Sequence, residues 1–331
     1  MNQVQAVAVD EISAAKERIE AVRREITRVY IGSPRAIDLM LTALLAQGHV
    51  LLEGVPGLGK TALVRALAEA LDLTFSRVQF TPDLMPADIT GTNIIVEDAG
   101  GGRRFEFQPG PVFANILLAD EINRATPKTQ SALLEAMQDR SVTVGRHSHE
   151  LAPPFFVLAT QNPVELEGTY PLPEAQLDRF LFKLRVGAPS RAELHAILDR
   201  TTGAQTATVT PILGRNRVLE LQRLMREVPV ARPVQDFAVR LIEASHPQSS
   251  SIPEIRKYLR FGSSPRGAQA IMLAAKVRAL RERRFSPSFA DVRAVATPSL
   301  RHRLLLNFDG EAEAIDSDAL VATLLERTPE G

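Results

Sequence analysis

Five short apolar runs alternate with helical stretches in the first 190 residues, and this alternation limits the possible folds more than any other feature of the sequence. Such runs are typical of strands that are buried on both faces of a sheet, and intervening helices provide the connections that parallel strands need. The alternation therefore predicts an α/β domain with a parallel sheet flanked by helices. The runs are His49–Glu53, Phe75–Gln79, Ile116–Ala119, Phe155–Thr160 and Phe180–Arg185.

The helices of this domain are indicated by apolar residues three or four positions apart. Two lie before the first run, over residues 11–30 and 34–47, and two lie between later runs, over residues 60–71 and 128–139. Two further segments, 91–108 and 141–151, consist of extended stretches around glycines, and we predict that each is an inserted β-hairpin.

After about residue 190 the apolar runs stop, and the spacing becomes helical throughout. The expected division is an α/β domain over residues 1–190 and a smaller all-α domain over residues 191–331. The helices of the second domain are expected over residues 190–200, 217–227, 234–245, 264–283 and 288–297.

Composition excludes several classes of function. The 331 residues contain 39 Lys and Arg against 39 Asp and Glu, so the chain lacks the strong positive field of many nucleic-acid-binding proteins. The absence of cysteine excludes disulfide scaffolds, thiolate metal sites and thiol catalysis. No apolar run is long enough to cross a bilayer, and the N-terminus has no basic start before an apolar stretch. We therefore expect a cytoplasmic protein without membrane insertion.

The first apolar run leads into a sequence that matches the phosphate-binding loop pattern G-x-x-x-x-G-K-[ST]. The glycines let the backbone curl so that its N–H groups point at phosphate oxygens, and the helix that starts at Ala62 adds its positive end. Lysine is expected to reach the β- and γ-phosphates, and the threonine hydroxyl is expected to bind Mg²⁺. The loop consists of Gly54, Val55, Pro56, Gly57, Leu58, Gly59, Lys60 and Thr61.

Polar side chains end two of the other runs. Asp120 and Glu121 follow the third run, where Asp120 is expected to hold the metal and Glu121 to act as general base on the attacking water. An acidic start of the next helix is the alternative interpretation of this pair. Asn162 follows the fourth run and is expected to orient the water or touch the γ-phosphate, although Asn-Pro is also a common turn.

These elements, in this order, resemble the AAA+ ATPases, and the closer resemblance is to the MoxR family. The resemblance covers nearly the whole chain, and its most diagnostic stretch is residues 168–180, GTYPLPEAQLDRF. The other stretches that carry it are residues 54–61, 118–125, 134–138, 159–163, 264–267 and 302–303.

The resemblance implies further site residues. Arg179 matches the arginine finger, which reaches the nucleotide of a neighbouring subunit; an ion pair with Asp178 is the alternative. Arg266 matches the second sensor arginine, which would bridge the two domains through the γ-phosphate. Tyr30, Ile31 and Gly32 resemble the turn beside the adenine. Three more arginines compete for an assisting role across the interface: Arg124, Arg185 and Arg191.

The resemblance also implies an activity and partners. The family pattern implies Mg²⁺-dependent ATP hydrolysis in a homo-oligomeric ring, expected to be a hexamer, that remodels or activates client protein complexes. Relatives often act with a separate protein that bears a von Willebrand factor A domain. Alternatives are an AAA+ nucleic-acid motor, a nucleotide-gated switch with little turnover, and a magnesium-chelatase-like subunit. A local excess of basic residues over 271–303 could bind nucleic acid or an acidic partner. The alternatives are a solvated helix face and pairing with the acidic segment 311–318.

Overall fold

The computed structural model describes residues 3–54, 59–97, 102–162, 168–202 and 208–330. Its centre is a five-stranded sheet in the order β2-β5-β8-β1-β9, and every neighbouring pair is parallel. The predicted α/β architecture is confirmed. The strands are β1 (Val50–Glu53), β2 (Phe75–Gln79), β5 (Ile116–Asp120), β8 (Phe156–Gln161) and β9 (Phe182–Arg185).

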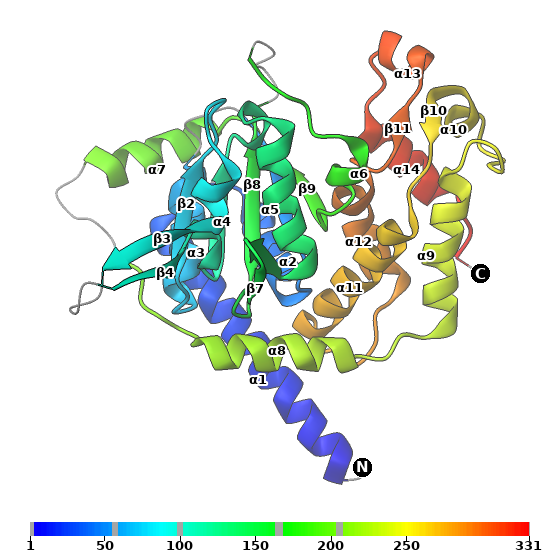
Figure 1. Cartoon of the computed structure of the whole chain (residues 1–331). Helices are drawn as coiled ribbons and strands as arrows, with labels where there is room; N and C mark the ends of the chain where they lie inside the picture. Colours follow the sequence, from blue (N-terminus) through cyan, green and yellow to red (C-terminus); the bar gives the residue numbers. More distant parts are fainter. Residues whose placement is uncertain (1–2, 55–58, 98–101, 163–167, 203–207, 331) are drawn as a thin grey trace.

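Alternate side chains of the strands pack into two apolar clusters, one on each face of the sheet. On β1, Val50 and Leu52 join a cluster formed with helices α1, α2 and α3, whereas Leu51 joins a second cluster formed with α4 and α5. Figure 1 shows α5 lying in front of the sheet strands. The helices are α1 (Gln3–Val29), α2 (Pro34–Leu45), α3 (Lys60–Ala70), α4 (Pro86–Thr90) and α5 (Pro127–Asp139), with a short 3-10 turn at Ile122–Arg124.

The two segments predicted as hairpins are antiparallel strand pairs. β3 (Gly91–Glu97) pairs with β4 (Arg103–Pro109), and β6 (Ser141–Val144) pairs with β7 (His147–Glu150). The two hairpins touch, because the His149 ring stacks on Phe107 with ring centroids 3.8 Å apart.

The second half of the chain is helical, with one small addition that the sequence did not indicate. β10 (Leu259–Phe261) and β11 (Leu305–Leu306) form an antiparallel pair, flanked by α10 (Pro253–Tyr258) and α13 (Phe308–Ala312). The remaining elements are α6 (Glu174–Leu177), α7 (Arg191–Thr202), α8 (Arg215–Glu227), α9 (Arg232–Ser245), α11 (Pro265–Arg281), α12 (Phe289–Leu300) and α14 (Ser317–Arg327). None of the helices in the described ranges has the length and apolar character needed to span a membrane.

The helical half packs against the α/β half through a shared core. Helix α11 contacts α1 and α2, α12 contacts β9, and Gln222 on α8 donates a 2.7 Å hydrogen bond to the carbonyl of Leu44 on α2. One continuous cluster of buried side chains therefore runs from Ala15 on α1 to Leu324 on α14. The boundary near residue 190 stays a prediction.

The basic residues of 271–303 are largely neutralised by carboxylates of the same chain. Arg281 bridges Glu20 and Asp38, with both distances 2.9 Å. Further pairs are Arg278 and Arg284 with Asp291, Arg283 with Glu17, Arg293 with Glu330, Arg301 with Asp318, and Arg303 with Asp178. Among these arginines, only Arg301 pairs with the acidic segment 311–318, through Asp318. The other arginines named here pair with carboxylates elsewhere in the chain.

Candidate functional site: a divided nucleotide site

Strand β1 and helix α3 frame the phosphate loop. A Cβ on Gly54 would lie 2.7 Å from the carbonyl oxygen of Val186, so the close approach of two backbones requires glycine there. Gly59 has φ +68° and precedes α3 without capping the helix through a side chain, which leaves the first N–H groups of the helix available to an anion. Ala62 is exposed in the first turn of α3, and Val55 to Leu58 lie outside the described residues.

The Lys60 side chain reaches back to Gly54. Its Nζ donates a short hydrogen bond to the carbonyl of Gly54. Partial burial lowers the pKa of Lys60, while the nearby carboxylates of Asp120 and Glu121 act in the opposite direction. An ammonium group held between a backbone carbonyl and two carboxylates is suited to bind phosphate oxygens.

Thr160 on β8 joins the two carboxylates at the end of β5. Its hydroxyl donates to Asp120 Oδ1 at 2.6 Å and accepts the Glu121 backbone N–H at 2.8 Å. Arg77 on β2 donates to the other oxygen of Asp120 at 2.7 Å, and Gln79 donates to Glu121 Oε2 at 2.7 Å. Both carboxylates are therefore held by neighbouring strands of the sheet.

Glu121 has a left-handed backbone conformation, with φ 55° and ψ 50°. A non-glycine residue in this region costs about 1–3 kcal/mol and is found most often at functional sites. The conformation turns the chain sharply after β5 and leaves the Glu121 side chain beside the phosphate loop. The cavity there has a volume of about 240 Å³ and is lined by Gly59, Lys60, Thr61, Arg77, Gln79, Asp120, Glu121 and Asn162.

Tyr30 lies on the other side of the phosphate loop. A Cβ on Gly59 would be 3.5 Å from the Tyr30 ring, and a Cβ on Gly32 would be 2.4 Å from its hydroxyl oxygen. Burial, with a contribution from Glu193, raises the pKa of the Tyr30 hydroxyl. Tyr30, the half-buried Ile31 and Gly32 thus lie close to Gly59, and their contact with the adenine stays a prediction.

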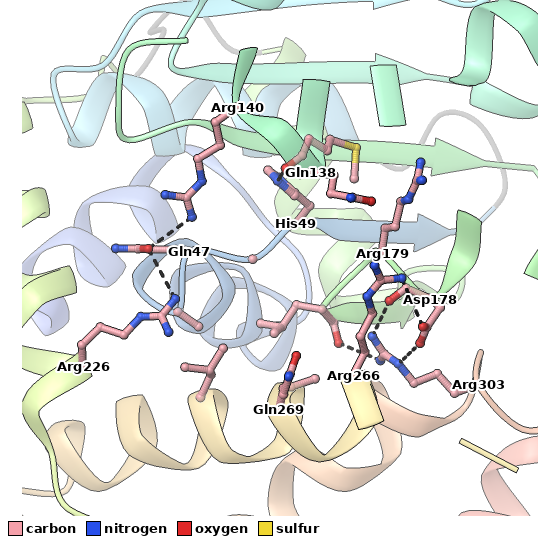
Figure 2. A pocket seen from close by; sticks show the side chains of 16 residues that line it. Gln47, His49, Gln138, Arg140, Asp178, Arg179, Arg226, Arg266, Gln269 and Arg303 are labelled. Atoms are coloured by element: carbon pink, nitrogen blue, oxygen red, sulfur yellow. Dashed lines mark hydrogen bonds and ion pairs between the residues drawn. The ribbon is translucent and has the colours of Figure 1, made fainter. Parts of the chain in front are cut away.

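A second cluster of polar side chains lies at the opposite edge of the sheet (Figure 2). His49 lies just before β1, and Arg179 lies just before β9, so both mark the edge where strands begin. Figure 2 shows Arg140 and Arg226 converging on Gln47, and Arg266 and Arg303 converging on Asp178. The cavity between these groups has a volume of about 240 Å³.

The structure places Arg266 with Arg179 and not in the cavity that Lys60 lines, and the expected bridge between the two domains through the γ-phosphate stays a prediction. Arg266 lies beside Arg179 because α11 packs on α1 and α2, and its N-terminus therefore faces the edge where β1 and β9 begin. His49 lies in the second cluster and Gly54 in the phosphate loop, five positions apart along β1. At about 3.3 Å per residue, the two ends of this strand are about 17 Å apart. The two cavities share no lining residue.

The three competing arginines do not line the cavity that contains Arg179, and an assisting role for any of them stays a prediction. Arg124 lies 3.1 Å from Glu121, on the phosphate-loop side. Arg185 pairs with Glu53, Asp316 and Asp318 on the same side. Arg191 is exposed at the start of α7. The alternative of an Asp178–Arg179 pair is not found, because Asp178 pairs with Arg303 and Arg266.

The residues of the first cavity fit a magnesium nucleotide. The Thr61 hydroxyl and the Asp120 carboxylate are the oxygen ligands that Mg²⁺ prefers, and they line one cavity with Lys60 and an uncapped helix start.

Comparison with known proteins agrees with this geometry. Residues 49–182 match the family described as "ATPase family associated with various cellular activities (AAA)", and residues 254–324 match the AAA lid domain. The chain is 42% identical over 316 residues to the protein named Chaperone MoxR1 of Mycobacterium tuberculosis, which covers 95% of this chain and 83% of that protein. This chain belongs to the MoxR family of AAA+ ATPases.

Two further similarities extend over the whole MoxR-family fold. The chain is 46% identical over 301 residues to YeaC of Bacillus subtilis, with 91% of each covered. It also superimposes on the solved structure of a protein from Cytophaga hutchinsonii with a TM-score of 0.92, at 37% identity and with 99% of each chain covered. The superposition includes residues 254–324, which match the lid domain, together with the α/β half.

Sequence reasoning missed Arg77, Gln79 and Thr160. Arg77 and Gln79 are two positions apart on β2, so their side chains lie on the same face of the sheet. This spacing could have indicated that both reach the carboxylates at the end of the neighbouring strand β5. Thr160 is nearly fully buried within an apolar run, and only its pairing with Asp120 across two strands reveals its role.

Proposed function

We propose that this MoxR-family chain hydrolyses ATP with Mg²⁺ in a closed ring, six-membered as the family resemblance implies, in which each active site is completed by the neighbouring chain. The observation that carries the proposal is the separation of the site onto two edges of one parallel sheet. Lys60 and Glu121 lie where strands end, and Arg179 and Arg266 lie where strands begin. A contact between two different edges is head-to-tail, which is the kind of contact that builds rings.

In this proposal the chain's own residues divide the work. Lys60 and the N–H groups that begin α3 bind the phosphates, and Thr61 and Asp120 hold Mg²⁺. Glu121 takes the proton of the attacking water, which Asn162 orients. The neighbour's Arg179 and Arg266 stabilise the charge that develops on the γ-phosphoryl oxygens. Mg²⁺, when bound, neutralises charge on the β- and γ-phosphates.

The free guanidinium of Arg179 supports its role between chains. Within the described residues, no hydrogen bond or ion pair links its side chain to another group, and its Nε is buried without an acceptor. A buried donor without an acceptor costs free energy, so a partner that supplies phosphate oxygens would remove that cost.

We further propose that hydrolysis remodels or activates a client protein complex, with a separate von Willebrand factor A domain protein as adaptor. The name of the Mycobacterium tuberculosis relative, Chaperone MoxR1, supports this over a nucleic-acid motor. The neutral charge of the chain and the internal pairing of the 271–303 arginines also argue against the motor. Glu121 and Arg179 favour turnover over a nucleotide-gated switch.

Steady-state ATP hydrolysis at increasing protein concentration, together with the mass of the assembly, tests the shared site. We expect activity per chain to rise as a ring-sized species forms. Lys60→Ala is expected to lose ATP binding, and Glu121→Gln to bind ATP without hydrolysing it. Arg179→Ala is expected to lose about 10³-fold or more in kcat.

Mixing the variants distinguishes the shared site from a site within one chain. In a mixed ring, a Glu121→Gln chain presents an intact Arg179 to the intact phosphate loop of an Arg179→Ala chain, so activity is expected to return. Arg217→Ala is the matched control, because Arg217 is an exposed arginine that pairs with Glu220 on its own helix. Full activity in a monomer would refute the proposal.

A further inference from the structure

Arg303 is a buried arginine of the helical half that holds the chain segment carrying Arg179. Its Nε donates to Asp178 Oδ1 at 2.8 Å, and its Nη2 donates to the carbonyls of Asp178 at 2.9 Å and Phe180 at 2.7 Å. Its Nη1 donates to the carbonyls of Leu181 and of Ser299 on α12. The side chain is 3% exposed. One guanidinium thus binds the backbone on both sides of Arg179 and anchors it to α12.

The Asp178 carboxylate binds the helical half a second time, at the start of α11. Ser264 Oγ donates to it at 2.9 and 3.0 Å, and Arg266 Nη1 lies 3.4 Å from it. Ser264 is the N-cap of α11, where it also accepts the Arg266 backbone N–H. The positive end of this 17-residue helix therefore favours the negative charge of Asp178.

Arg179 and Arg266 are both fixed through Asp178. Arg179 follows it directly in the chain, and Arg266, which pairs with it, lies two residues after the serine that donates to it. We propose that Asp178 is a positioning residue, which together with Arg303 locks Arg179 and Arg266 into one rigid pair for presentation to a neighbouring nucleotide. This inference rests on the proposed function, because it concerns the arginines that complete the neighbour's site.

The charges of Asp178 and Arg303 stabilise each other, which agrees with this positioning role. Burial lowers the pKa of Arg303, while the charge of Asp178 acts in the opposite direction. A buried guanidinium needs its carboxylate, so the removal of the Asp178 charge frees Arg303 to seek other acceptors and releases the segment. A displacement of about 1 Å at a group that acts on the transition state can cost about 10²-fold in rate.

The experiment compares Asp178→Asn with the wild type by steady-state ATP hydrolysis and by titration with a fluorescent ATP analogue. We expect kcat to fall by about 10²-fold and the affinity for the analogue to change less than about twofold, because the phosphate loop is intact. Adding Asp178→Asn to Arg179→Ala is expected to cause a much smaller loss than in the wild type, since a positioning residue acts through the groups it positions and only Arg266 then remains. Mixing Asp178→Asn with Glu121→Gln chains is expected to restore activity.

Arg284→Met provides a matched control. It breaks another arginine–carboxylate pair of the helical half, in which Asp291 is 1% exposed, at the far end of α11. Helix α11 has 17 residues and is about 25 Å long, so this pair is remote from Arg179. We expect lower stability and an unchanged kcat, which separates loss of positioning from a general loss of packing.

Three results would overturn the positioning role: kcat of Asp178→Asn within about twofold of wild type, a further full loss in the double variant, or an equal loss of kcat in Arg284→Met. If Asp178→Asn does not fold, Ser264→Ala serves instead, because it removes the serine hydrogen bond to Asp178 without burying a lone charge. Its kcat is then expected to fall severalfold, again with a smaller effect in the Arg179→Ala background, and an unchanged kcat would overturn the proposal. If Arg179→Ala itself keeps full activity, the shared-site function fails, independently of Asp178.

Discussion

Protonation of His49 is expected to destabilise the fold in acid. The ring is 6% exposed, and burial, aided by the nearby Arg140, lowers its pKa from 6.5 to about 4. Its two nitrogens have opposite partners: Val157 N–H donates to Nδ1 at 3.0 Å, and Nε2 lies 3.2 Å from the carbonyl of Met137. A proton on Nδ1 would face the Val157 donor, so the folded protein favours the neutral ring.

The sign and size of the effect follow from this pKa. Between pH 6.5 and about 4 the unfolded chain binds the His49 proton and the folded chain does not, so stability falls as the pH falls through this interval. At about 1.4 kcal/mol per pH unit, the full interval corresponds to about 3 kcal/mol. Above pH 6.5 the His49 ring is neutral in both the folded and the unfolded chain, so its protonation no longer lowers the stability.

Urea unfolding of the wild type and of His49→Gln from pH 4 to 8 measures this contribution. The buried His302, whose pKa is also lowered by burial, acts in both proteins and cancels in the difference. We expect the free energy of unfolding to lose about 3 kcal/mol more in the wild type than in the variant as the pH falls from 6.5 to 4. Parallel pH curves, or an NMR titration of His49 near pH 6.5, would refute the reasoning.

Two other substitutions test the phosphate-loop side. Gly54→Ala places a Cβ 2.7 Å from the carbonyl oxygen of Val186 and is expected to weaken ATP binding at least tenfold; an unchanged affinity for a fluorescent ATP analogue would contradict the close-packing argument. Thr160→Val removes the hydroxyl that holds Asp120 and Glu121. Since hydrogen bonds to charged groups contribute about 1.5–3 kcal/mol, kcat is expected to fall at least tenfold. A wild-type kcat in this variant would show that the hydroxyl is dispensable.

The sequence was most informative where function depends on local pattern. The phosphate loop, the carboxylates after β5 and Asn162 after β8 each follow a strand that the apolar runs already indicate. The parallel sheet then brings them to one edge, so the first cavity could be predicted from spacing and topology together.

The second edge could not be predicted in the same way. The place of Arg266 depends on how α11 packs against α1 and α2, and these contacts join residues more than 200 positions apart. The Asp178–Arg303 pair likewise joins residues 125 positions apart. The β10–β11 pair could not be predicted from the sequence, because strands of three and two residues are too short to show a hydrophobic periodicity.

The continuous core from α1 to α14 determines where motion can occur. A swing of the helical half away from the sheet would part α11 from α1 and α2, and each large apolar side chain uncovered would cost about 1.5–3 kcal/mol. A hinge across the middle of the chain would therefore be costly, and in the proposed ring a change at the nucleotide would be passed on as a tilt of one whole subunit against the next. In that proposed ring the contacts between subunits would be the flexible parts, and a client would sense a change in the shape of the ring.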